Sequence, residues 1–84
     1  MPELRKVTVR STRQARAVAA VLPTLPGFRS AQEIHVALRA GGERIGIATV
    51  YRQLRFLAGQ GSVDTIRGGN GEMLYRQRRV SASH

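Results

Sequence analysis

The residues best suited to chemistry lie in one stretch, Ile45 to Gly59. Glycines near both ends, Gly46 and Gly59, and the apolar spacing between them predict one helix of about three turns. At roughly 100° per residue, one stripe of that helix is entirely aliphatic. The stripe consists of Ile47, Val50, Leu54 and Leu57. We expect it to pack against the rest of the domain.

The other side of the same helix carries hydrogen-bonding side chains. Thr49, Arg52 and Arg55 point away from the stripe, and Tyr51 lies on its flank. An arginine can donate two hydrogen bonds to a phosphate or a guanine, and a tyrosine ring can pack on thymine methyl groups. The pattern therefore favours a helix that meets phosphates and base edges. Phe56 also projects near this polar side, and one interpretation is that it packs beneath a neighbouring hairpin.

Composition narrows the class of protein. The chain has 84 residues, enough for one small domain, and a formal net charge of +9 from 14 Lys and Arg against 5 Asp and Glu. Such a charge favours a polyanionic partner, the alternative being a merely solvated basic surface. The absence of cysteine excludes disulfides and thiolate metal sites. No stretch approaches the roughly 20 apolar residues that cross a bilayer, and no signal core begins the chain. We expect a cytoplasmic protein without a membrane partner.

Two segments precede the central helix region. Residues 1–11 are expected to form a basic N-terminal arm, which could follow a phosphate backbone or enter a minor groove, or simply be a frayed terminus. Thr12 is a good N-cap for a first helix that runs to about Leu22. Arg13 and Arg16 lie in its first turns, where they oppose the helix dipole. They therefore suit a ligand better than they suit stability.

The remaining elements have strong local signals. Ser30 and Glu33 form a capping box that starts a second helix, which ends at Gly41-Gly42 and leads through a short link into the third. Two short strands, 62–67 and 72–78, are separated by a loop that contains Asn70-Gly71, a strong hairpin signal.

This order predicts a mainly α domain with a small β-hairpin. The architecture is a winged helix-turn-helix: three helices plus a two-stranded antiparallel wing over residues 12–78, followed by a tail at 79–84.

Several segments, in this order, resemble a known family. They are Arg10-Ser11-Thr12-Arg13-Gln14, Ser30-Ala31-Gln32-Glu33-Ile34-His35, Gly46-Ile47-Ala48-Thr49-Val50-Tyr51-Arg52-Gln53-Leu54, Gly61-Ser62-Val63-Asp64 and Gly71-Glu72-Met73-Leu74-Tyr75-Arg76. Together they resemble the N-terminal DNA-binding domain of the ferric uptake regulator family, most closely the actinobacterial zinc uptake regulators. The Thr-Val-Tyr-Arg run is the most specific part of the match.

The resemblance implies a metal-responsive bacterial transcription factor, normally a repressor that binds AT-rich inverted repeats of double-stranded DNA as a homodimer. It implies that Tyr51 and Arg52 read the major groove and that Arg10 reaches the minor groove. With the arginines and threonine considered above, the expected DNA-binding set is Arg10, Arg13, Arg16, Thr49, Tyr51, Arg52 and Arg55.

The chain departs from the family in three places. Ala15 stands where the family usually has arginine, with Arg16 next. No cysteine follows Tyr75-Arg76, which leaves Asp64 and His84 as weak metal-ligand candidates, two groups where structural zinc expects four. The chain also stops before the family's dimerisation domain. We therefore expect no metal in this chain, zinc or iron only with that domain, and a monomeric or weakly dimeric fragment.

Two alternatives to DNA binding stay open at this stage. A basic RNA- or ribosome-binding protein would share the charge, although the chain has few aromatic stacking platforms. A winged helix can also serve only as a protein-interaction module. An enzyme is not expected, because the sequence contains no nucleophile–base pair, phosphate-binding loop or close carboxylate pair.

Overall fold

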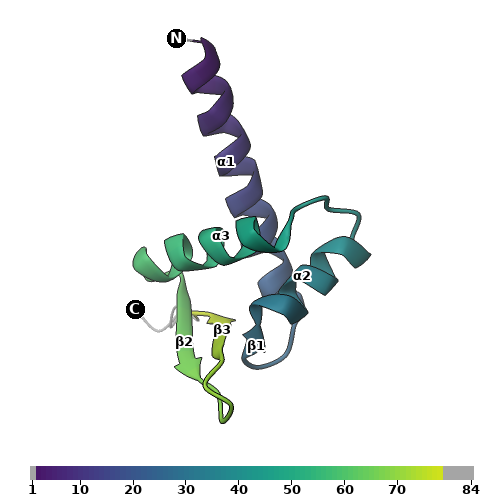
Figure 1. Cartoon of the computed structure of the whole chain (residues 1–84), viewed down its shortest axis with the longest axis vertical. Helices are drawn as coiled ribbons and strands as arrows, with labels where there is room; N and C mark the ends of the chain where they lie inside the picture. The colour runs from purple at the N-terminus through teal and green to yellow at the C-terminus, as the bar shows by residue number, and fades with distance from the viewer. Residues whose placement is uncertain (1, 79–84) are drawn as a thin grey trace, which may run out of the picture.

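The computed structural model describes residues 2–78, with side chains from Thr12 onward. Helix α3 crosses α1 near the middle of the molecule, with α2 on one side and the small sheet below (Figure 1). In chain order the elements are α1 (Pro2–Val21), the 3-10 turn η1 (Leu22–Thr24), β1 (Arg29–Ser30), α2 (Ala31–Ala40), α3 (Ile47–Gly59), β2 (Val63–Arg67) and β3 (Met73–Gln77). This is the expected winged helix, with two differences.

The first difference is at the N-terminus. The predicted helix start at Thr12 is wrong, because α1 already begins at Pro2. Proline is well tolerated in a first helical turn, and no glycine or further proline interrupts the chain up to Val21. Residues 2–11, expected as a separate arm, thus continue directly into the helix. The predicted end near Leu22 is confirmed, and Pro23 accounts for it.

Helix α2 begins where the sequence predicts. The Ser30 hydroxyl accepts a hydrogen bond from the Glu33 backbone N–H at 3.1 Å, and the Glu33 carboxylate accepts one from the Ser30 N–H at 2.9 Å. That backbone N–H, assisted by the nearby Arg29 guanidinium, holds the pKa of Glu33 below its ordinary value. The capping box therefore satisfies two of the backbone donors at the helix start.

The second difference is in the sheet. Strands β2 and β3 form the predicted hairpin, closed by a Gly71 N–H to Gly68 carbonyl hydrogen bond of 2.9 Å, with Gly71 at φ +85°. The sheet has one strand more than the predicted two-stranded wing, because β1 adds to β3 in an antiparallel pair and gives the order β1-β3-β2. A strand of two residues has no periodicity of its own, so only its partner reveals it.

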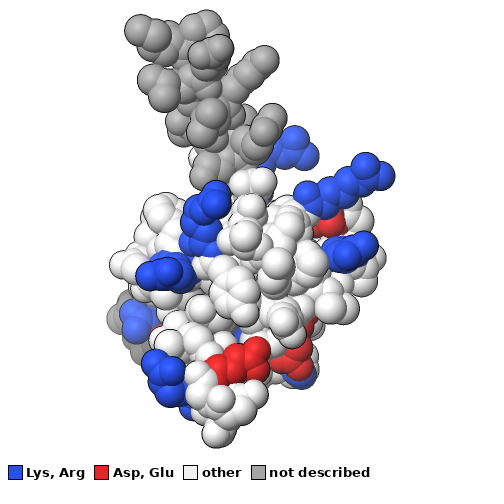
Figure 2. Space-filling view, viewed as in Figure 1, with Lys and Arg blue, Asp and Glu red and all other residues white. Residues whose placement is uncertain are grey.

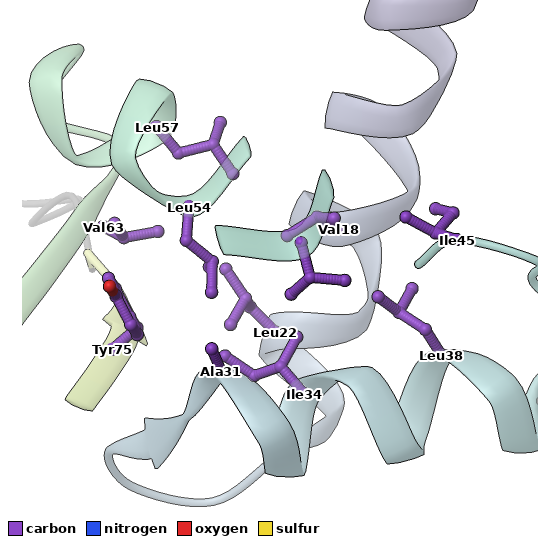
Figure 3. Packing of buried hydrophobic residues seen from close by; sticks show 11 residues of the cluster. Val18, Leu22, Ala31, Ile34, Leu38, Ile45, Leu54, Leu57, Val63 and Tyr75 are labelled. Atoms are coloured by element: carbon purple, nitrogen blue, oxygen red, sulfur yellow. The ribbon is translucent and has the colours of Figure 1, made fainter. Parts of the chain in front are cut away.

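The core lies where the three helices and the sheet meet (Figure 3). Its side chains of zero exposure, Val18, Ile34, Val50 and Leu54, come from all three helices. Strands β2 and β3 add Val63 and Tyr75. The core thereby fixes α3 on one face and leaves its other face to solvent. Within the described residues, no helix is long and apolar enough to cross a membrane.

Candidate nucleic-acid interface

The two faces of α3 differ sharply. Val50 and Leu54 are fully buried and Leu57 is 6% exposed, which confirms most of the predicted stripe. Ile47, its first member, is only half-buried. The sequence pattern also missed one buried position: Gln53 is 4% exposed beside this stripe, although its polar side chain favours solvent.

The outward face holds the residues expected to meet a ligand. Tyr51 is 41% exposed, and Arg52 and Arg55 are both exposed. Thr49 is half-buried near the start of the helix. Two cations and a tyrosine therefore stand together on a helix whose other face is anchored in the core.

The N-terminus of α3 lacks a side-chain cap. Gly46 occupies the N-cap, no side chain accepts from the first turn, and that turn contains no acidic residue. The free backbone N–H groups and the positive end of the helix dipole remain directed outward. This end of α3 is therefore electrostatically compatible with a phosphate.

A groove separates α1 from α3. It has a volume of about 490 Å³ and brings Arg16 of α1 to the same hollow as Arg52 of α3. Its lining residues are Thr12, Ala15, Arg16, Ala19, Arg52, Gln53, Phe56, Leu57 and Gln60, none of them acidic. Arg13 is exposed on α1 but does not line the groove. Arg10 lies in α1, and its side chain is outside the described part of the chain.

Charge is unevenly distributed on the face seen in Figure 2. The surface over α3, below the N-terminal part of α1, shows basic and uncharged side chains. Acidic side chains lie at the lower end of this view, and one more lies at the right edge among basic side chains. A polyanion approaching α3 from this side therefore meets no carboxylate there.

The wing supports the flank of α3. Tyr75 of β3 is 5% exposed, and burial is the main reason that its pKa is raised. Tyr51 adds to that rise in the pKa, whereas the Arg55 guanidinium opposes it. The electrostatic coupling joins a buried tyrosine of the sheet to two outward residues of α3.

Of the two weak metal candidates, only Asp64 lies in the part of the chain that the structure describes. The Asp64 carboxylate accepts a hydrogen bond from Nε of Arg78 at 3.0 Å and pairs with Nη2 of Arg76 at 3.6 Å. Arg76 also stacks over the Phe28 ring, 4.4 Å from its centroid. The Asp64 carboxylate is thus paired with two arginines. Among the residues that are described, no group of three His, Asp or Glu side chains could hold a metal ion. His84 lies outside that part of the chain.

Comparison with known proteins gives one consistent result. The model of the Ferric uptake regulator family matches residues 6–84. The zinc uptake regulation protein of Mycobacterium tuberculosis is 54% identical over 69 residues, which cover 82% of this chain and 53% of that protein. The chain thus spans about half the length of this relative.

Solved structures agree. FurB of M. tuberculosis, a zinc uptake regulator, superposes with a TM-score of 0.78 at 51% identity, over 90% of this chain and 57% of that one. The ferric uptake regulator of Vibrio cholerae gives a TM-score of 0.71 at 29% identity, over 84% of this chain and 53% of that one.

Proposed function

Because the chain belongs to the ferric uptake regulator family, we propose that it binds double-stranded DNA as the sequence-specific domain of a metal-responsive transcriptional repressor. The family is one of regulators, and the chain is a regulator domain rather than an enzyme. The observation that carries the DNA-binding proposal is the outward face of α3. Tyr51, Arg52 and Arg55 are exposed there, while the opposite face is locked into the core. A helix held in this way can enter a major groove without rearranging.

Each expected side chain has a role in this proposal. Arg52 donates two hydrogen bonds to a guanine, one to O6 and one to N7, and Tyr51 packs on a thymine methyl group. Arg55 and Thr49 bind phosphates beside them. Arg13 and Arg16 of α1 bind the backbone, and Arg10 lies at the narrow minor groove of an AT-rich site. The target is an AT-rich inverted repeat. Its two half-sites are related by two-fold symmetry, which matches a homodimer of a longer protein. This protein would act in the cytoplasm.

We propose that control of DNA binding by a metal requires a protein as long as the relatives. The M. tuberculosis zinc uptake regulation protein and FurB are both named for zinc uptake, which supports zinc as the effector. The described residues do not fit a zinc site, since Asp64 is paired with Arg76 and Arg78. Metal binding and stable dimerisation are therefore proposed to depend on a region outside the matched part, which covers about half of each relative.

The test is the variant Arg52→Ala. A duplex is first selected from a randomised pool by the wild-type chain, and affinities for it and for a scrambled duplex are measured by fluorescence anisotropy. Losing a bidentate contact should reduce the preference for the selected duplex by about 1–3 kcal/mol, or roughly fivefold to 150-fold. Binding of the scrambled duplex should weaken far less, because only one cation is lost.

The matched control is Arg39→Ala, which removes an exposed arginine from the last turn of α2. It should leave the preference unchanged. If Arg52→Ala and Arg39→Ala reduce binding equally on both duplexes, α3 does not read bases. If an RNA duplex of the same sequence competes equally, the RNA-binding interpretation is favoured instead.

A further inference from the structure

Phe56 projects near the polar side of α3, as its spacing predicts, but it lines a groove that the sequence did not predict. It does not pack beneath the hairpin: 53% of it is exposed, and it lines the groove between α1 and α3. It follows Arg52 by one helical turn, so the two side chains project from nearly the same face of α3. The ring is therefore an exposed apolar surface in the same groove as the Arg52 guanidinium.

The groove exists because the α1 wall is built from small side chains. Ala15 and Ala19, four residues apart, face Phe56 and Leu57 across the hollow. Arg16 and Arg52 add a cation from each wall, and no acidic residue lines the space. The occupant that fits presents apolar groups between negative charges. A DNA strand does so wherever it contains a thymine, because the 5-methyl group lies in the major groove and the phosphates of the backbone border that groove.

Helix geometry places Phe56 relative to Arg52. Four residues advance the helix by about 6 Å, at 1.5 Å per residue. Stacked bases follow one another every 3.4 Å or so along a strand. A helix lying in the major groove would therefore carry Phe56 about one to two base pairs beyond the base that Arg52 contacts.

We propose that Phe56 is a further specificity-determining residue that contacts the 5-methyl group of a thymine one or two base pairs from the Arg52 contact. Arg16, on the opposite wall, binds a phosphate of the same strand. The inference rests on the proposed DNA-binding function and deepens it. Phenylalanine is a suitable partner for this methyl group, and uracil, which lacks the group, cannot replace thymine there.

The test replaces single thymines of the selected duplex by deoxyuridine. For the wild-type chain, one substitution near the Arg52 contact should weaken binding about fourfold, the value of one buried methyl group. Phe56→Ala should bind the thymine and deoxyuridine duplexes equally at that position. Val36→Ala removes an exposed apolar side chain, 65% exposed, from α2, and it should keep the wild-type ratio. Thermal unfolding checks that each variant is folded.

A second pair of variants tests the groove without touching Phe56. Ala15→Leu narrows it and should weaken binding of every duplex severalfold. Ala20→Leu adds the same side chain at an exposed position of α1 outside the groove, and it should bind as the wild type does.

The outcomes are separable. If the wild-type chain selects no preferred duplex, the proposed function itself fails. If it does, but Phe56→Ala keeps the wild-type thymine-to-deoxyuridine ratio at every position, the methyl contact is overturned. Unchanged DNA binding by both Ala15→Leu and Phe56→Ala overturns the whole inference and leaves the groove to a protein partner.

Discussion

Helices α2 and α3 form the two halves of the helix-turn-helix, and their ends are completed in opposite ways. α2 has a side-chain cap, an acidic residue in its first turn and a basic residue in its last. α3 has none of these three features, although it is the longer helix. Caps and matched terminal charges each contribute a few tenths to about 1 kcal/mol.

The difference separates stability from binding. α2 satisfies its own polar groups and needs no ligand. α3 leaves its N-terminal donors and its outward arginines unmatched by any carboxylate of its own, and it depends on its buried face for stability. The three changes below test this contrast, in order of the effect expected.

The largest effect should come from the buried face of α3. Leu54→Ala removes a fully buried side chain and should lower the free energy of unfolding by about 2–5 kcal/mol, measured by urea denaturation. Ile34→Ala, an equally buried change in α2, should cost a similar amount. A loss below about 1 kcal/mol for Leu54→Ala alone would mean that the core does not anchor α3.

The second effect concerns the uncapped start of α3. No atom lies within 4 Å of a Cβ built on Gly46, so a side chain fits there. Gly46→Ser and Gly46→Asp should both stabilise the fold by a few tenths of a kcal/mol, about the gain of a cap over glycine. Only the aspartate should weaken binding of the selected duplex, roughly threefold to tenfold at low salt, because it repels a phosphate. Equal affinities of the two variants would place this helix end away from the DNA.

The smallest effect is the pH dependence of the α2 cap. The pKa of Glu33 is lowered from its ordinary value of 4.5, chiefly by the Ser30 N–H. The unfolded chain therefore binds more protons than the folded one in this range, and stability falls as the pH drops. The contribution of the ionised carboxylate is present above about pH 4.5 and is lost below the lowered pKa.

Glu33→Gln preserves the capping geometry but does not titrate. Melting temperatures of this variant and of the wild type, measured between about pH 6 and pH 3, should converge or cross as the acid is protonated. Parallel curves would show that the ionised carboxylate gives no extra stability.

Local signals account for what the sequence predicts well. The start of α2 follows from Ser30 and Glu33, and the hairpin follows from a glycine-rich loop, because each signal acts within a few residues. The stripe of α3 is equally local, since helical periodicity alone defines it. The outward position of Tyr51 and Arg52 follows from the same periodicity.

The features that the sequence did not predict depend on residues far apart in the chain, or on two local helix signals that compete. Strand β1 depends on β3, more than forty residues later, and the groove at Phe56 depends on small side chains of α1. At the N-terminus, Thr12 is a good cap by type, but nothing before it stops a helix that begins at Pro2. A favourable cap therefore did not mark the boundary.

Ser30 belongs to two elements at once. Its backbone is paired with Leu74 in the sheet, and its hydroxyl holds the Glu33 N–H at the start of α2. Peeling this edge strand away would also unwind the first turn of the helix. We therefore expect amide hydrogens of the wing and of early α2 to exchange with solvent at a common rate, as one cooperative unit. The wing and the helices would then move as one rigid body, and the wing would not open independently.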